Sequence, residues 1–142
     1  MNSKLINENP KTYVLVFQTG DEVMDGLKKF ARKERLSASQ FTAIGAFSEV
    51  LLGFFNVEKK AYKKIPISEQ VEVLSLIGDI ALEEAEPKIH AHVVVGKSDG
   101  TAHGGHLVQA HVRPTLEVIL TESPKHLHRV IDPETGLALI RL

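Results

Sequence analysis

The sequence contains no cysteine, so disulfide bonds, thiolate catalysis and cysteine-based zinc sites are all excluded. It also lacks an excess of charge of one sign, because 17 Lys and Arg residues are balanced by 18 Asp and Glu residues, for a formal net charge of −1. Binding to nucleic acid through bulk positive charge is therefore not indicated. Seven histidines stand out against this background. Any metal or acid–base chemistry must come from imidazole and carboxylate groups.

No apolar run is long enough to cross a bilayer. Stretches such as Val50–Phe55 fall far short of the roughly 20 residues that a membrane helix needs. The first residues, MNSKLINENPK, are polar and lack the apolar centre of a secretory signal. We therefore expect a cytoplasmic protein with no membrane segment. The 142 residues, 43% hydrophobic and 25% charged, suffice for one domain with its own core.

Residues 19–36 predict one amphipathic helix, because their apolar side chains recur at helical spacing. Those side chains are Val23, Leu27, Phe30 and Ala31. We expect Thr19 or Asp21 to cap the first turn of this helix. The remaining apolar segments read as strands separated by turn residues. They are Thr12–Gln18, Ser39–Phe47, Val50–Val57, Tyr62–Ile67, Val71–Ile80, Ile89–Val95, His106–Arg113, Leu116–Leu120 and Leu137–Leu142.

The fold class that follows is α+β (an α/β hybrid), with one main helix packed on an antiparallel-rich, mixed sheet. Most intervals between strands are too short for crossover helices, which favours hairpins. We expect residues 1–11 to form a loose polar arm and residues 12–142 to form the single domain. Asn56–Lys64 (NVEKKAYKK) predicts an exposed basic hairpin.

Several predicted strands are apolar on both faces, for example Tyr13–Phe17 and Leu116–Leu120. A small sheet with one covering helix cannot bury both faces within one subunit. Either the sheet closes into a barrel-like or doubly covered core, or one face packs against another subunit. Self-association is the sharper of the two hypotheses.

Histidines are concentrated after the middle of the chain. His90 and His92 are two residues apart on a predicted strand, so both side chains point to the same face of the sheet. A tetrahedral metal ion needs a further ligand from elsewhere. The candidates that follow the Gly-rich loop are His103, His106 and His111.

Strand pairing decides which histidine joins the first two. Residues directly opposite each other in an antiparallel pair share a face. An even sum of paired residue numbers places His106 with the first two histidines, and an odd sum places His111 there. The sequence does not fix the register. Gly104 and Gly105 permit the close backbone approach that a ligand site needs, so we favour His106, with His103 or His111 in reserve.

Zinc is the metal that three neutral imidazoles suit best. Three protein ligands leave a position for water, whose pKa can fall to about 7, so the site would suit catalysis. Glu117 is then the candidate fourth ligand or proton acceptor, and Arg113 the candidate anion holder. The alternative is that these histidines form ordinary surface or interface contacts. His126 and His128 repeat the two-residue spacing beside turn residues, which favours a solvated basic surface.

The segment GKSDGTAHGGHLVQAHVRPTLEVIL, with the preceding HAHVVV, resembles the signature of the Plants and Prokaryotes Conserved (PPC) domain. FTAIGAFSEVLLGFFN, QVEVLSLIGDIAL and DPETGLALIRL agree in the same order, so the resemblance spans about residues 12–142. The resemblance implies a single domain that assembles as a homotrimer. It also implies that His90, His92 and His106 occupy the positions that bind zinc in prokaryotic relatives.

The resemblance leads to two functional hypotheses. The family is commonly described as DNA-binding, which implies a trimeric zinc protein that acts on DNA or as a regulatory interaction module. The Arg-Gly-Arg-Pro hook of the plant proteins is absent from this sequence, and with it the usual electrostatic affinity for DNA. Alternatively, fold analogy to acetolactate decarboxylase implies a zinc-dependent lyase or hydrolase that binds a small carboxylate or carbonyl substrate at the metal. A purely structural metal site is a third reading.

Overall fold

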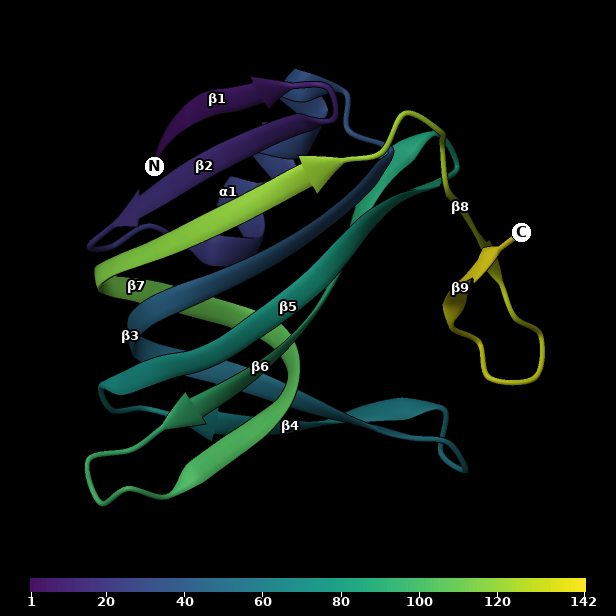
Figure 1. The fold of residues 1–142 in the computed structure, drawn as a ribbon. Helices are drawn as coiled ribbons and strands as arrows, with labels where there is room; N and C mark the ends of the chain where they lie inside the picture. Colours follow the sequence, from purple (N-terminus) through teal and green to yellow (C-terminus); the bar gives the residue numbers. More distant parts are fainter.

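The computed structural model covers residues 1–142 and contains one helix and a nine-stranded sheet (Figure 1). Helix α1 spans Val23–Glu34. The strands are β1 (Asn2–Glu8), β2 (Lys11–Gln18), β3 (Ala38–Asn56), β4 (Ala61–Ile67), β5 (Val71–Glu83), β6 (Glu86–Gly96), β7 (Ala102–Glu122), β8 (His128–Ile131) and β9 (Ala138–Arg141). All pairings are antiparallel except that of β5 with β8, so the predicted α+β architecture with a mixed sheet is confirmed.

Helix α1 forms where the amphipathic pattern predicts it, and its four predicted apolar side chains are all buried. The predicted cap is wrong, because the capping residue is Glu22 rather than Thr19 or Asp21. The Glu22 carboxylate accepts hydrogen bonds from the backbone N–H groups of Met24 and Asp25. Asp21 pairs instead with the N-terminal ammonium at 2.7 Å, which takes its carboxylate away from the helix. No helix in the structure has the length and apolar character that crossing a membrane requires.

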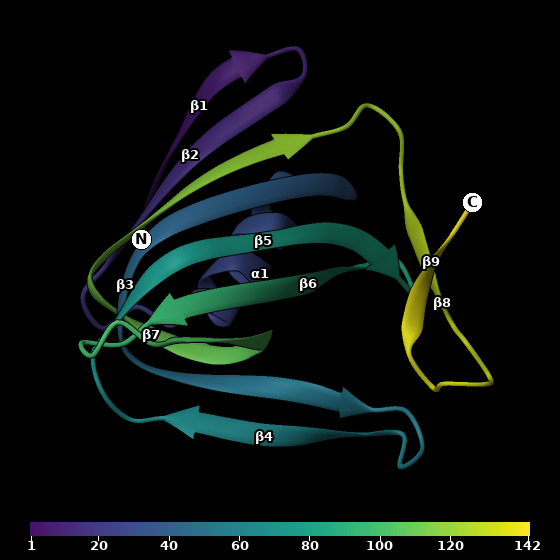
Figure 2. The ribbon, with the colours of Figure 1, turned by 60° about the horizontal axis from the view of Figure 1, so that its bottom comes forward.

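Strands β3 and β7 are long and bent, and they give the sheet its shape. The first half of β3 pairs with β5 and its second half with β4, while β7 runs antiparallel beside both halves. The first part of β7 pairs with β6, which also pairs with β5. Strands β3, β5, β6 and β7 therefore form a closed ring, with α1 packed behind the curled sheet (Figure 2). The barrel-like core considered from the sequence is thus present within one chain.

The sequence predicts breaks where the structure has bends. Each of the two long strands is predicted as two separate segments, because Pro114 and the polar residues after Phe47 are typical of turns. In the structure, β-bulges shift the β3–β7 register near Gly45 and let both strands bend without ending. A Cβ at Gly45 would lie 2.2 Å from the carbonyl oxygen of Thr115, so only glycine fits where the two bends cross.

The two ends of the chain differ from the expectation of a loose arm and a single last strand. Residues 2–8 form strand β1, which pairs with β2 at the sheet edge although all its residues are exposed. Backbone hydrogen bonds to β2, rather than burial, hold it in place. At the other end, β8 and β9 form a hairpin that joins the sheet through one parallel pair, Leu82 with His128. The hairpin stands apart from the main sheet in Figure 1.

The outer face of the sheet keeps several large apolar side chains in water. Ile44 of β3, Ile77 of β5 and Ile119 of β7 are exposed by 62%, 56% and 46%, respectively. The alternate residues of the same strands point to the other side and form the core under α1. One face of β3, β5 and β7 is therefore buried within the chain, and the apolar residues on the opposite face remain uncovered.

Candidate metal centre

Strands β6 and β7 bring three histidines to one face of the sheet. His92 of β6 lies directly opposite His106 of β7, so the sum of the paired residue numbers is even. His90 shares the outer face because it is two residues away on the same strand. The intervening Ala91 and the following Val93 are buried on the inner face. The structure therefore has the register that places His106, rather than His111, beside His90 and His92.

The three rings converge closely enough to share one ion. The Nε2 atoms of His90 and His92 are 3.2 Å apart, and one ring nitrogen from each of the three histidines lies within 4.8 Å of the others. A zinc ion bound tetrahedrally at about 2.0–2.1 Å separates its nitrogen ligands by roughly 3.4 Å. The separation of the His90 and His92 nitrogens is of this size, and a ring nitrogen of His106 lies within 4.8 Å of both. The donor set and its spacing fit a zinc ion.

Burial keeps two of the three rings neutral. Burial, with the neighbouring His90 and His92 adding to its effect, lowers the pKa of His106 to about 4. Burial also lowers the pKa of His90, with the Arg129 guanidinium adding to the effect and the Asp79 carboxylate opposing it. A neutral imidazole retains the lone pair that a metal ion needs, so these rings are ready ligands at neutral pH. The buried Nδ1 atom of His106 has no hydrogen-bond partner within the protein, as is typical of a site that takes a ligand.

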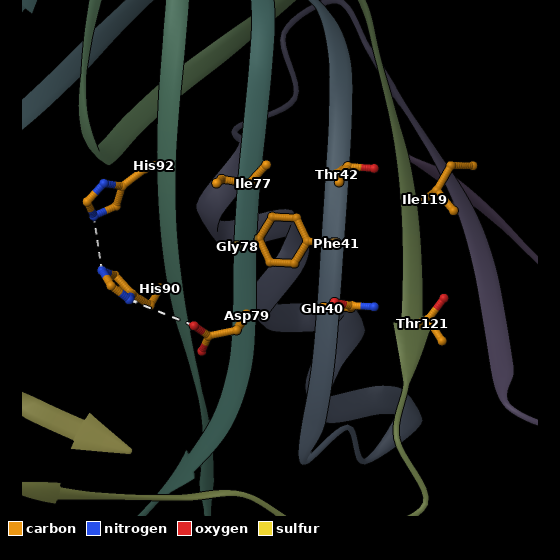
Figure 3. A pocket seen from close by; sticks show the side chains of 10 residues that line it. All are labelled: Gln40, Phe41, Thr42, Ile77, Gly78, Asp79, His90, His92, Ile119 and Thr121. Carbon is orange, nitrogen blue, oxygen red and sulfur yellow. Dashed lines mark hydrogen bonds and ion pairs between the residues drawn. The ribbon is translucent and has the colours of Figure 1, made fainter.

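The histidine cluster lies between two cavities. An open groove of about 710 Å³ on the outer face is lined by His90 and His92 together with residues of β3, β5 and β7 (Figure 3). A second cavity of about 340 Å³ separates the cluster from the C-terminal hairpin, and His90, His106 and Arg129 are among its lining residues. The Tyr62 ring of β4 lies against His106, with ring centroids 4.9 Å apart. A ligand can therefore reach the cluster from two sides.

Asp79 and Arg129 adjoin the cluster, although neither is predicted as a site residue from the sequence. Asp79 of β5 is paired with His90, and Arg129 of β8 donates a hydrogen bond to the Asp79 carboxylate. The available signal for Asp79 is that it is the acidic residue inside the apolar run Leu76–Ile80, because a charge in such a run needs a partner. Arg129 carries no comparable signal, since its neighbourhood is created only when the C-terminal hairpin meets β5.

The structure does not bring Glu117 or Arg113 to the histidines. Glu117 lies on the part of β7 that pairs with β2 and β3, and strands β3 and β5 separate it from β6 in the sheet. Arg113 is exposed near the bend of β7, beyond the stretch that pairs with β6. Neither side chain lines either of the two cavities beside the cluster.

The remaining histidines are engaged elsewhere. His111 contacts the Glu49 carboxylate at 2.9 Å, and His103 contacts the Thr101 hydroxyl at 3.3 Å. His126 contacts the hydroxyl of a buried serine, Ser37. His128 is exposed at the start of β8. The cluster therefore consists of His90, His92 and His106 without the reserve candidates.

The sequence profile of the Plants and Prokaryotes Conserved domain, abbreviated PCC or PPC, matches residues 6–124. The chain belongs to this family. A PPC protein from Pyrococcus horikoshii is 34% identical, with a TM-score of 0.87 over 99% of this chain and 95% of that one. A candidate DNA-binding protein from Bacteroides thetaiotaomicron is 28% identical, with a TM-score of 0.93 over 99% and 96% of the two chains. A metal-containing protein from Archaeoglobus fulgidus is 30% identical, with a TM-score of 0.86 over 99% and 97%.

Two further similarities are narrower in scope. The bifunctional protein GlmU of a Synechococcus strain is 29% identical over 129 residues, which are 89% of this PCC chain and 20% of that protein. The chain thus spans about a fifth of the length of this curated relative. A Staphylococcus aureus protein similar to α-acetolactate decarboxylase has a TM-score of 0.58 at 13% identity, over 85% of this chain and 53% of that one. This last similarity concerns the fold alone.

Proposed function

We propose that this PCC-domain protein binds one zinc ion per chain through His90, His92 and His106. The observation that carries the proposal is the approach of three histidine nitrogens to within 4.8 Å of one another on one sheet face. Zinc is favoured over softer metals because the sequence offers imidazole and no thiolate. The metal-containing relative from Archaeoglobus fulgidus, which aligns over almost the whole chain, supports a metal site in this fold.

The protein's own residues prepare this site in three ways. The β6–β7 ladder sets the spacing of His92 and His106, burial holds His106 neutral, and Tyr62 covers one side of the His106 ring. Three protein ligands leave part of the coordination sphere free for water or a ligand. When bound, the ion would supply Lewis acidity at that open position.

Metal analysis of protein purified without a histidine tag tests the proposal. We expect about one zinc per chain in the wild-type protein and in His128→Ala, which removes an exposed histidine outside the cluster. His92→Ala should lose the metal without unfolding, because His92 is exposed and its removal leaves no cavity. Stoichiometric zinc in the His92→Ala variant would contradict the assignment.

We also propose that the chain assembles as a homotrimer, as the family resemblance implies. The exposed Ile44, Ile77 and Ile119 on the outer face support a subunit contact there, because isolated domains rarely leave a contiguous apolar face in water. Light scattering should give the mass of a trimer for the wild-type protein. Ile77→Glu should dissociate it, whereas Val57→Glu, which changes an exposed apolar residue outside the sheet face, should not. A monomeric wild-type protein would contradict this assembly.

DNA is the partner that the Bacteroides relative suggests for such a trimer, and the family resemblance adds a regulatory protein as the alternative. The basic side chains that suit phosphate contacts lie on and beside β4, at Lys59, Lys60, Lys63 and Lys64. Fluorescence anisotropy with duplex DNA at salt concentrations from about 50 to about 200 mM should show affinity that falls as salt rises. Absence of binding at the lowest salt concentration would remove DNA as a partner.

A zinc-dependent lyase or hydrolase is the second candidate function, and the two cavities that meet at His90 favour it. An open metal position beside a cavity suits a small carboxylate or carbonyl compound, which a Lewis acid polarises. Incubation with a panel of 2-oxo and 2-hydroxy acids, followed by NMR, should reveal turnover that zinc supports and His92→Ala abolishes. Turnover that persists in His92→Ala would contradict a role for this centre.

A further inference from the structure

His90 has a second polar neighbour besides His92. Asp79 lies directly opposite His90 in the β5–β6 ladder, and its Oδ2 atom is 3.9 Å from Nδ1 of His90 (Figure 3). The other ring nitrogen of His90, Nε2, is the atom that approaches His92. The Asp79 carboxylate therefore faces the ring nitrogen that points away from the histidine cluster.

The Asp79 carboxylate is held from its other side by Arg129 of β8. The Arg129 Nη2 atom donates to Oδ1 of Asp79, and Nη1 donates to the backbone carbonyl of Ala138 at 2.8 Å. The Arg129 side chain is only 5% exposed. A charge removed from water in this way requires a partner of opposite sign. Asp79 is the only carboxylate within ion-pair distance of it.

We propose that Asp79 is a positioning residue for the metal site and that Arg129 holds its carboxylate in the orientation that serves His90. This inference rests on the proposed zinc site. A carboxylate that accepts the Nδ1–H of a histidine fixes the tautomer in which Nε2 is free to bind a metal ion. The 3.9 Å separation exceeds a hydrogen bond, so the proposed bond from Nδ1–H to the carboxylate requires a small rotation of the His90 or Asp79 side chain.

Arg129 extends this arrangement to the C-terminal hairpin. That hairpin pairs with β5 through a single residue pair, so few backbone contacts fix its position. The bridge from Ala138 through Arg129 to Asp79 links both strands of the hairpin to the strand that faces His90. The last segment of the chain is therefore part of the metal site rather than an independent appendage.

Zinc affinity measured by competition with a chromophoric chelator tests the role of Asp79. Asp79→Asn keeps the size of the side chain but removes its charge, and we expect about 10- to 100-fold weaker binding. Arg129→Lys keeps the charge but loses the paired donors, so it should weaken binding in the same direction by a smaller factor. Glu117→Gln is the matched control, because it alters a carboxylate of the same sheet on the part of β7 that lies away from His106. It should leave the zinc affinity unchanged.

The tautomer of His90 in the metal-free protein gives a readout that a general loss of stability would not move. Ring ¹⁵N NMR should show Nδ1–H in the wild-type protein and a mixture in Asp79→Asn. If Asp79→Asn fails to fold because Arg129 is left unpaired, the double variant Asp79→Asn/Arg129→Met removes both charges and takes its place. Wild-type affinity and an unchanged His90 tautomer in the variant would overturn this inference. Absence of zinc binding in the wild-type protein would instead overturn the proposed function, while the tautomer still tests the Asp79–His90 contact.

Discussion

Acidification of the metal-free protein should weaken its fold, and His106 should account for a defined share of the loss. A histidine in an unfolded chain has a pKa near 6.5, whereas burial lowers the pKa of folded His106 to about 4. Between these two values the unfolded chain binds a proton that the folded chain does not. The free energy of unfolding therefore falls as the pH falls through this window. Above this pH window His106 does not change the free energy of unfolding, and below it the destabilisation reaches its full size.

The size of the effect follows from the same pKa difference. Each pKa unit corresponds to about 1.4 kcal/mol, so the drop from 6.5 to about 4 sets an upper limit of roughly 3–4 kcal/mol. The His106 ring is only partly buried, and solvent screening reduces the interaction. We therefore expect His106 to contribute about 1–2 kcal/mol to the loss of stability between about pH 7 and pH 4.

Urea denaturation in the presence of a chelator, followed by circular dichroism at about pH 7, 5.5 and 4, measures this contribution. His106→Gln cannot take up a proton, so its unfolding free energy should fall by about 1–2 kcal/mol less than that of the wild-type protein over the same range. His128→Gln, at an exposed histidine outside the cluster, should follow the wild-type pH dependence. Equal pH slopes for His106→Gln and the wild-type protein would refute the argument.

Three further predictions concern the metal, the sheet and the helix cap. Bound zinc should leave the protein as the pH falls from about 6 to about 4, because imidazole binds metal only when neutral. The low pKa of His106 delays its protonation to the lower end of this range. Zinc retained after dialysis at about pH 3.5 would contradict an all-histidine site. Gly78→Ala should lower the free energy of unfolding, measured by urea denaturation, by about 1–3 kcal/mol and should weaken zinc binding. The new Cβ would lie 2.3 Å from Cζ of Phe41 and 2.6 Å from the carbonyl oxygen of His90. An unchanged urea midpoint would show that β5 and β6 can separate freely. Glu22→Ala should lower the free energy of unfolding by about 1 kcal/mol, because the backbone N–H groups of Met24, Asp25 and Ala110 lose their acceptor. Glu22→Gln should retain most of the wild-type stability. Equal stability of the alanine and glutamine variants would argue against the cap.

Local patterns in the sequence predict the helix and much of the sheet correctly. The four apolar residues of α1 are recognisable because helical periodicity repeats within a short segment. The cores of most strands are likewise placed, from β2 to β7. The continuity of β3 and β7 is not predicted, because a bulge and a turn use similar residues and only pairing with a neighbouring strand distinguishes them.

The candidate metal centre is likewise predicted from the sequence only in part. The spacing of His90 and His92 already places both side chains on one face, since the period of a strand is fixed by backbone geometry. The sequence also narrows the third ligand to His103, His106 or His111, and the parity of the β6–β7 pairing decides between His106 and His111. The positions of Asp79 and Arg129 beside His90 are not predicted from the sequence, and neither is the separation of Glu117 from the cluster.

The sequence by itself determined the fold class, the absence of sulfur ligands and a pair of histidines on one strand face, because each depends on composition or on neighbours along the chain. Only the tertiary structure decided that His106 lies beside the other two histidines, that Asp79 lies opposite His90, and that Arg129 of the last hairpin pairs with Asp79. These features depend on strand register and on the docking of distant segments. Both are set by the joint packing of many side chains around the closed ring of strands, so no short stretch of sequence contains them.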